Sequence, residues 1–341
     1  MNRLLRWLAC WSVLLLLIAH RAAGQQVNLL AWGDWGVDSP DRQQVADSMA
    51  AYAAKSAAPM DAALVLGDNF YVPLHSADDP AFQTLFEKTY DAKRMNFPFF
   101  CLLGNHDYEM LDGHVRYEWE MKYAATHPDS RFKLPAEWYR LDLPADHPLV
   151  TILLLDSDKE GVGKQGFMPA SQWDDELRWI NAQLSGPRAA WTICCAHHTV
   201  YSNGNKGDNG ILVEDWAGLF KKYKVDFYLC GHDHTLQHLE VPGAFSSFVV
   251  SGGGGAKRDQ MLRDNRGPFS RSEAGFAAFT ITPGAADVRL LAENGSILHE
   301  FVRTKAGAVR IIQDSSSTPR VKDPLRAIQG IDDSIETQPA N

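Results

Sequence analysis

The chain has 341 residues, of which 45% are hydrophobic, 33 are Lys or Arg and 42 are Asp or Glu, so its formal net charge is −9. This length suffices for one large domain or two ordinary ones. An acidic chain is a poor candidate for non-specific nucleic-acid binding, which depends on neutralising phosphates with positive side chains. Any phosphate that the protein handles must therefore be attracted by a local positive site.

The first 24 residues have the pattern of an export signal. Arg3 and Arg6 supply a positive start, residues 7–19 form a largely apolar stretch, and residues 22–24 offer small side chains for cleavage before Gln25. The apolar stretch is short for a membrane span, which needs about 20 residues. We expect cleavage and a periplasmic or extracellular protein without a stable membrane anchor; the alternative is an uncleaved anchor. Cleavage would leave 30 basic against 42 acidic residues, a charge of about −12.

Strand and helix signals alternate through the first part of the chain. Short apolar runs predict strands, and longer runs with an apolar stripe predict helices. Ser39 or Asp38 is placed to cap the first helix. The expected strands are residues 27–32, 62–66 and 99–103, and the expected helices are residues 40–55, 80–90 and 115–125.

In the second part of the chain, strands and helices no longer alternate strictly, and some strands follow one another directly. Two strands are expected at residues 138–143 and 149–155. Helices at 171–184 and near 212–223 and strands at 191–196 and 227–230 follow. The last expected strands form an antiparallel set at residues 245–251, 275–282 and 286–291, with the four glycines at 252–255 in a turn.

Mixed βαβ units with added antiparallel strands predict an α/β (α+β) fold, a four-layer αββα sandwich of two mixed β-sheets flanked by helices. We expect the catalytic domain to cover residues 25–305. The polar segment 306–341 shows weak periodicity, which predicts a loosely ordered tail. Four cysteines lie in expected core strands, and we interpret them as buried packing residues, with pairing between adjacent strands as the alternative. They are Cys101, Cys194, Cys195 and Cys230.

Five of the apolar runs end in turns that carry metal-ligand residue types. Any one of these turns alone would be an ordinary strand-to-turn signal. Open α/β folds bind ligands at the carboxyl edge of their sheets, where five turns can bring two Asp, one Asn, one Tyr and three His together, enough for two metal ions and metal-assisted hydrolysis. The turns are Gly33-Asp34, Gly67-Asp68-Asn69-Phe70-Tyr71, Gly104-Asn105-His106-Asp107, His197-His198 and Gly231-His232-Asp233-His234.

The donor types indicate which ions would bind. Carboxylate and phenol oxygens are hard donors, whereas Asn and His suit a borderline divalent ion. A phenol with a reference pKa of about 10 needs a strong Lewis acid to bind as phenolate at neutral pH. Tyr71 therefore favours a trivalent ion such as Fe³⁺, unless it is only a packed aromatic side chain. Asp68 has two carboxylate oxygens and can bridge two ions.

In their order and composition the five turns resemble the five sequence blocks of the metallophosphoesterases. Tyr71, three residues after Asp68, narrows the resemblance to the purple acid phosphatases, and residues 228–237 are similar to the small, tartrate-resistant animal type. The similarity runs in order through residues 27 to 300. It implies an Fe³⁺ ion bound by Asp34, Tyr71 and His234, a bridging Asp68, and a divalent ion (Fe²⁺, Zn²⁺ or Mn²⁺) bound by Asn105, His197 and His232.

The resemblance implies an exported acid phosphatase that hydrolyses phosphomonoesters, small or protein-borne, through attack by a metal-bound hydroxide. The two ions would carry +5, and Asp34, Asp68, the Tyr71 phenolate and one hydroxide would carry −4, so the centre would attract a phosphate dianion. The alternatives are a phosphodiesterase with the same centre and a non-catalytic binding protein that keeps the metals for structure.

Three side chains, one of them also a predicted metal ligand, are expected to contact the substrate. His106 would contact the phosphate or protonate the leaving alkoxide, with Asp107 orienting it; Asn105 would contact the phosphate as well. The family often has a second substrate-facing histidine in the loop after the fourth block, but residues 199–210 contain none. Lys206 lies at about the matching distance and would bind phosphate as a point charge; otherwise it is a solvated loop lysine. His198 is expected outside the ligand set.

Overall fold

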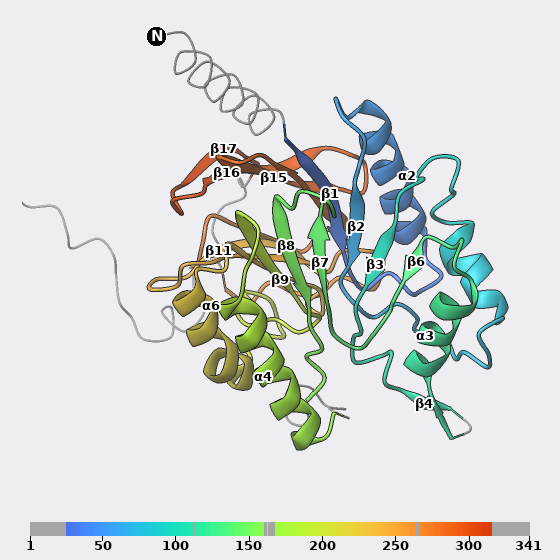
Figure 1. The fold of residues 1–341 in the computed structure, drawn as a ribbon. Coiled ribbons are helices and arrows are strands. Elements are labelled where there is room, and N and C mark those ends of the chain that lie inside the picture. The colour runs from blue at the N-terminus through green and yellow to red at the C-terminus, as the bar shows by residue number, and fades with distance from the viewer. Residues whose placement is uncertain (1–24, 112, 160–161, 163–167, 264–265, 316–341) are drawn as a thin grey trace, which may run out of the picture.

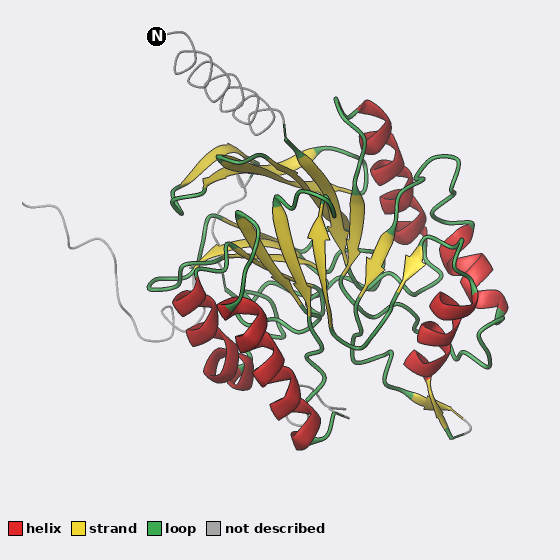
Figure 2. Ribbon diagram, viewed as in Figure 1, coloured by secondary structure: helices red, strands yellow, loops and turns green. Residues whose placement is uncertain are grey.

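A computed structural model describes residues 25–111, 113–159, 162, 168–263 and 266–315. The expected export signal and residues 316–341 of the expected tail lie outside the described part of the chain. Two mixed β-sheets pack face to face, with helices on their outer faces (Figures 1 and 2). The predicted αββα sandwich is therefore confirmed. Within the described residues, no helix is both long enough and apolar enough to cross a membrane.

The first sheet has eight strands in the order β17–β16–β15–β14–β1–β2–β3–β6. Its parallel part supplies three neighbouring strand ends for the ligand turns, and its antiparallel part extends the sheet away from them. The parallel strands are β1 (Val27–Trp32), β2 (Ala62–Val65), β3 (Phe99–Cys101) and β6 (Phe132–Lys133). The antiparallel strands are β14 (Gly275–Ile281), β15 (Ala285–Ala292), β16 (Ile297–Thr304) and β17 (Val309–Asp314).

The second sheet has seven strands in the order β13–β11–β12–β10–β9–β8–β7. Its central strands β8 (Val150–Leu154), β9 (Trp191–Cys195), β10 (Phe227–Cys230) and β12 (Ser247–Ser251) are parallel. Antiparallel strands flank them: β7 (Tyr139–Leu143), β11 (Leu236–Glu240) and β13 (Phe269–Arg271). A separate hairpin of β4 (Met110–Leu111) and β5 (His114–Val115) projects from the body below α3 (Figure 1).

The helices lie close to their predicted positions. α2 (Pro40–Lys55) has the predicted bounds because the Ser39 hydroxyl accepts a hydrogen bond from the backbone N–H of Arg42 at 3.2 Å. α3 (Arg116–Thr126) and α4 (Ala170–Ser185) also match their predictions within one or two residues. The helix near 212–223 divides into α5 (Gly210–Leu212), the π-helical η2 (Val213–Ala217) and α6 (Gly218–Tyr223).

The segment 80–90 corrects a prediction of regular α-helix. It contains the π-helix η1 (Phe82–Glu87), in which Phe82 and Phe86 are both buried. Phe82 stacks on Tyr123 of α3, with ring centroids 3.9 Å apart and an interplanar angle of 4°. The wider π turn occurs together with this aromatic packing. Local helix propensity alone therefore does not predict which type of helix forms in this segment.

The late strands correct a second prediction. β12 does not join β14 and β15 in one antiparallel set; it lies in the second sheet, parallel to β10. β11, β13, β16 and β17 were not predicted. β17 pairs with β16, so the first sheet extends to Asp314 and the tail cannot begin at residue 306. The sequence of β17 lacks the alternation of apolar and polar residues that predicts a strand, because β17 is an edge strand exposed to solvent. Ile311 and Ile312 are 39% and 42% exposed.

Two apolar cores hold the layers together. One lies between the two sheets and includes Leu29, Phe227 and Phe279. The other lies between the second sheet and its helices, where Trp173 stacks on Trp216 with centroids 5.3 Å apart. All four described cysteines are free and buried, which confirms their interpretation as packing residues.

A pair of histidines crosses the interface between the sheets. His238 on β11 and His299 on β16 are fully buried, with 2.9 Å between His238 Nδ1 and His299 Nε2. Burial, and then the neighbouring His238, lower the pKa of His299 to about 3, with Asp314 opposing the shift. Burial also lowers the pKa of His238, although Glu240 opposes the shift. Both rings are therefore neutral in the folded protein.

We expect this pair to make the fold less stable in acid. Unfolding exposes His299 to water, where it binds a proton below a pKa of about 6.5. Because its pKa in the folded protein is about 3, the free energy of unfolding should fall by about 1.4 kcal/mol per pH unit through this histidine between the two values. We expect the free energy of urea unfolding to vary less steeply with pH in His299→Gln than in the wild type between about pH 4.5 and 6.5. The difference in slope should correspond to about one proton taken up on unfolding. His147→Gln, at a side chain 76% exposed, should keep the wild-type slope. Equal slopes in all three proteins would contradict a neutral pair.

Candidate metal centre

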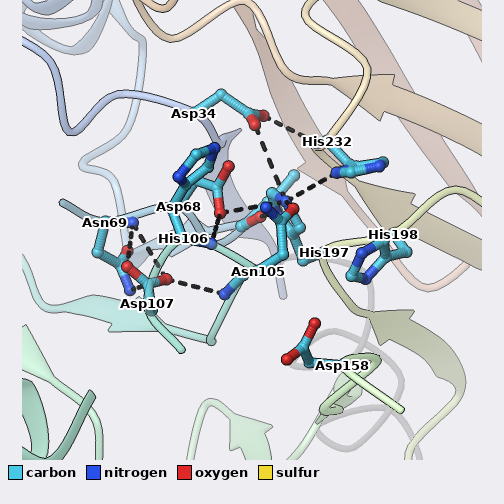
Figure 3. A network of polar contacts seen from close by, with 12 residues as sticks. Asp34, Asp68, Asn69, Asn105, His106, Asp107, Asp158, His197, His198 and His232 are labelled. Carbon is cyan, nitrogen blue, oxygen red and sulfur yellow. Dashed lines mark hydrogen bonds and ion pairs between the residues drawn. The ribbon is translucent and has the colours of Figure 1, made fainter. Parts of the chain in front are cut away.

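The turns after β1, β2, β3, β9 and β10 open at one edge of the two sheets, and they bring all the predicted ligands together. Figure 3 shows the core of this cluster, with carboxylate, amide and imidazole groups converging on a common space. The carboxyl edge of parallel strands is where the fold leaves backbone and side chains free to bind a ligand. The residues are Asp34, Asp68, Tyr71, Asn105, His197, His232 and His234.

Three of the ligand positions have a strained backbone. Asp34, Asp68 and His232 have φ values of 61°, 52° and 65°, and each follows a glycine. Among the described residues only one other non-glycine residue, Lys224 at the end of α6, has a positive φ. Left-handed backbone costs energy for residues with a Cβ and clusters at functional sites. The repeated Gly-ligand turn therefore indicates that the chain reverses sharply to present these side chains.

Glycines make room for the ligand turns. A Cβ on Gly104 would lie 2.4 Å from the backbone nitrogen of Asp68 and 2.8 Å from Nδ1 of His197. A Cβ on Gly252 would lie 2.8 Å from Oδ2 of Asp34. The glycine run at 252–255 thus packs directly against the first ligand turn, close to the site.

One group of donors forms around Asp34. Single ligand atoms of Asp34, Asp68 and His234 all lie within 4.8 Å of one another. His234 Nε2 is 3.2 Å from Asp34 Oδ1, and the Tyr71 hydroxyl donates to Asp68 Oδ2 at 2.9 Å. Tyr71 Oη is also 3.3 Å from His234 Nε2. These four side chains surround one small volume.

A second group of donors forms around His197. Its Nε2 atom lies 3.3 Å from Asp68 Oδ1, 3.2 Å from Asn105 Oδ1 and 3.2 Å from His232 Nδ1. Asp68 therefore gives Oδ2 to the first group and Oδ1 to the second. Asp68 lies within 3.3 Å of donors in both groups, and Asp34 of the first group also reaches the second, with its Oδ1 atom 4.0 Å from His197 Nε2.

Backbone carbonyls set the tautomers of two ligand histidines. His197 Nδ1 donates to Leu66 O at 2.8 Å, and His234 Nδ1 donates to Lys257 O at 2.7 Å. Because a carbonyl can only accept, Nδ1 carries the proton in both rings and Nε2 faces the donors. This is the arrangement that a metal-binding histidine needs.

The donor set is rich in negative and neutral groups and holds no cationic side chain other than histidine. Among the described residues, the ion pairs of Asp34 and Asp68 are made with histidines alone. Burial opposes ionisation of Asp68, but His197 and His106 hold its pKa well below the ordinary value. Although burial lowers the pKa of His197, Asp68 and Asp34 raise it to about 10. Burial, Asp68 and Asp34 all raise the pKa of Tyr71. In the absence of metal, protons on the histidines balance the negative charge of the carboxylates. The oxygen and nitrogen donors are of the types that bind metal cations, so two such ions fit the site chemically.

His106 lies beside the donors without joining them. Its ring packs on Tyr71, with centroids 4.3 Å apart, and its Nδ1 atom is 2.6 Å from Glu109 Oε1. Glu109 was not predicted as a partner of His106, although its position three residues later in the same turn was a usable signal. The backbone N–H of His106 donates to Asp68 Oδ1 at 2.9 Å, which fixes this turn to the shared carboxylate.

Asp107 does not orient His106, which corrects the prediction. Its carboxylate is fully buried and accepts hydrogen bonds from the backbone N–H groups of Gly104 at 2.8 Å, Asn69 at 2.9 Å and Phe70 at 3.2 Å. The turn directs this side chain inward, beneath the ligands (Figure 3). Asp107 instead fastens the second ligand turn to the third.

A cavity of about 480 Å³ adjoins the donors. Its lining includes His198, Thr199, Lys206, Asn209 and the predicted ligand His232. His198 is buried, with Nδ1 2.9 Å from Ser157 Oγ. Lys206 Nζ lies 4.0 Å from Asp259 Oδ2, and its side chain is 37% exposed. The lysine therefore has access both to the cavity and to solvent.

The sequence of the chain is similar to a known protein family and to curated relatives. Residues 28–236 match the family model described as calcineurin-like phosphoesterase. Tartrate-resistant acid phosphatase type 5 of Sus scrofa is 30% identical over 327 residues, which cover 84% of this chain and 94% of the relative.

Two solved structures share the fold. Purple acid phosphatase PPD1 from yellow lupin (Lupinus luteus) has a TM-score of 0.62 at 17% identity, covering 82% of this chain and 54% of its own. GAP50, the anchor in the inner membrane complex of Plasmodium, has a TM-score of 0.69 at 18% identity, covering 85% of this chain and 90% of its own.

The close packing at Gly104 generates a prediction. In Gly104→Ala the new methyl group meets backbone of the Asp68 turn, so we expect loss of bound metal and a cost of about 1–3 kcal/mol in the free energy of unfolding. Metal content per chain and urea unfolding measure the two effects. Gly218→Ala is the matched control, because a Cβ there, on α6, meets nothing within 4 Å. Wild-type metal content in Gly104→Ala would show that the turn can move without harm.

Proposed function

The chain belongs to the calcineurin-like phosphoesterase family, in the purple acid phosphatase group, and on this premise we propose that it is an exported acid phosphatase with a dinuclear Fe³⁺–M²⁺ centre. Family membership makes it a metal-dependent phosphoesterase. The observation that carries the two-metal proposal is that the donors form two groups, with the Asp68 carboxylate within 3.3 Å of both. A single metal ion would not require such a bridge.

The donor chemistry supports one assignment of the two ions. Asp34, Tyr71 and His234 would hold Fe³⁺, since a phenol and a carboxylate are hard oxygen donors. Asn105, His197 and His232 would hold Fe²⁺, Zn²⁺ or Mn²⁺, and Asp68 would bind both ions. When bound, the ions would supply a water of lowered pKa as nucleophile and stabilise the charge on the phosphate oxygens.

The remaining residues would bind and orient the substrate. The Asn105 amide, with its oxygen in the second donor group, has an NH₂ group that can donate to a phosphate oxygen. His106, packed on Tyr71 but outside both groups, would contact the phosphate or the leaving oxygen. Lys206, which lines the cavity, would attract the phosphate as a point charge.

The proposal of export rests on residues 1–24, with Arg3 and Arg6 before a short apolar stretch. Phosphomonoesters, small or protein-borne, are the proposed substrates because the similar relatives are acid phosphatases. The likeness to GAP50 concerns the fold alone. Against a non-catalytic role, this chain keeps the complete donor set and His106 beside it.

The visible spectrum of the purified protein tests the metal assignment. A phenolate bound to Fe³⁺ gives a broad purple band, so we expect iron in the protein and a band that Tyr71→Phe abolishes. Tyr90→Phe is the control, because Tyr90 is also buried but its hydroxyl bonds to Trp32 Nε1 at 3.1 Å. A colourless protein filled with zinc or manganese would overturn the Fe³⁺ assignment and leave a more general metallophosphoesterase.

Rates on 4-nitrophenyl phosphate and bis(4-nitrophenyl) phosphate test the reaction, because the two esters share a leaving group. We expect the monoester to react faster. A monoester dianion carries one more charge than a diester, so Lys206→Ala should raise KM for the monoester about three- to tenfold and change KM for the diester less. Lys222→Ala, on α6, is the control. Faster diester hydrolysis would favour the phosphodiesterase, and an unchanged KM in Lys206→Ala would make Lys206 a solvated loop residue.

A further inference from the structure

Glu109 connects the side chain that would face the substrate to a buried cation. Its Oε1 atom is 2.6 Å from His106 Nδ1, and its Oε2 atom accepts a hydrogen bond from Arg116 Nη2 at 2.9 Å. The Arg116 side chain is only 6% exposed, whereas those of Glu109 and His106 are 33% and 34% exposed. Each carboxylate oxygen has its own partner, so the carboxylate is held in one orientation.

Arg116 is fixed by the same backbone that presents the metal ligands. It is the first residue of α3, and its Nη1 atom donates to Phe70 O at 2.6 Å and also to His106 O. Phe70 lies between Asp68 and Tyr71 in the second ligand turn, and His106 follows Asn105 in the third. The position of the guanidinium is therefore tied to the positions of both turns.

The His106 ring is constrained on two sides. Tyr71 packs against its face, and Glu109 binds Nδ1. Because a carboxylate accepts hydrogen bonds, Nδ1 carries a proton and Nε2 is the ring atom left to meet a substrate. Within the described residues, Nε2 of His106 has no hydrogen-bond partner of its own.

We propose that Glu109 is a positioning residue, held in place by Arg116, which aims His106 Nε2 at the leaving-group oxygen of an alkyl phosphomonoester. The inference rests on the proposed function, because it assumes monoester hydrolysis at this centre. In the step, the His106 ring carries a proton on each nitrogen; the bond between phosphorus and the ester oxygen breaks, and that oxygen takes the proton from Nε2. The water that adds to phosphorus returns one proton to the ring and leaves the other on inorganic phosphate. An alkoxide needs this proton to depart, whereas a nitrophenolate does not.

The contacts of Glu109 differ from those of a purely structural ion pair elsewhere in the chain. Arg131 and Glu87 are also 2.9 Å apart, and the Arg131 side chain is 8% exposed. There the other carboxylate oxygen of Glu87 accepts from Ser130 and Tyr123, which are part of the local packing. Glu109 instead directs its other oxygen to a histidine at the metal centre. Glu87 is therefore a matched control.

Steady-state kinetics of the holoenzyme separate positioning from a structural role. For Glu109→Gln we expect kcat on an alkyl monoester, glycerol 2-phosphate, to fall about tenfold or more, within the range of proton-transfer catalysis. On 4-nitrophenyl phosphate it should fall less than about threefold, with KM and metal content unchanged. Glu87→Gln should leave both kcat values at the wild-type level. Equal losses on both esters, or no loss on either, would overturn the proposal.

A second measurement does not depend on turnover. In ¹⁵N-histidine-labelled, Zn²⁺-loaded protein, the Nδ1–H proton of His106 should be protected from exchange and visible by NMR, and His106→Gln identifies it by its absence. Glu109→Ala should remove this signal, and Glu87→Gln should keep it. A signal that persists in Glu109→Ala overturns the positioning role. A wild-type protein that shows the Glu109-dependent signal but hydrolyses no monoester would instead refute the proposed function.

Discussion

The carboxylate of Asp68 is shared between two groups of donors, and much of the surrounding structure serves to hold it there. Its Oδ2 atom accepts from Tyr71, while its Oδ1 atom faces His197 and accepts from the backbone of the third turn. This position requires the left-handed turn after β2 and the absence of a side chain at Gly104. It also requires β1 and β3 on either side of β2, so that their turns arrive beside it.

Burying this carboxylate has an electrostatic consequence for the whole site. Without cations, the charge of Asp34 and Asp68 is balanced by protons on His197 and His234, whose pKa values are raised to about 10 and about 9 against the effect of burial. Metal ions would displace these protons, so binding of metal and release of protons are linked. Ligands that bind only the folded state also stabilise it. The free energy of metal binding could therefore offset the cost of the left-handed backbone in the ligand turns.

The sequence predicted the parts of the molecule that depend on neighbouring residues. The strands before the ligand turns and the start of α2 after Ser39 appear where expected, because apolar runs and helix caps are local signals. All the predicted ligands converge because parallel strands end at one edge. Sheet membership was harder: β12 joins the second sheet, and nothing in residues 245–251 distinguishes parallel from antiparallel pairing. Side-chain direction within a turn was also hidden: the sequence suggested Asp107 as the partner of the His106 ring, whereas Glu109 makes that contact.

Each donor group draws residues from both sheets. The first group combines Asp34 and Tyr71 from the first sheet with His234 from a turn of the second, and the second group combines Asn105 with His197 in the same way. An ion bound in either group would therefore couple the two layers mechanically at this edge. Sliding of one sheet over the other would stretch metal–ligand bonds as well as disturb apolar packing. With ions bound, the site would at the same time be a cross-link that resists shear.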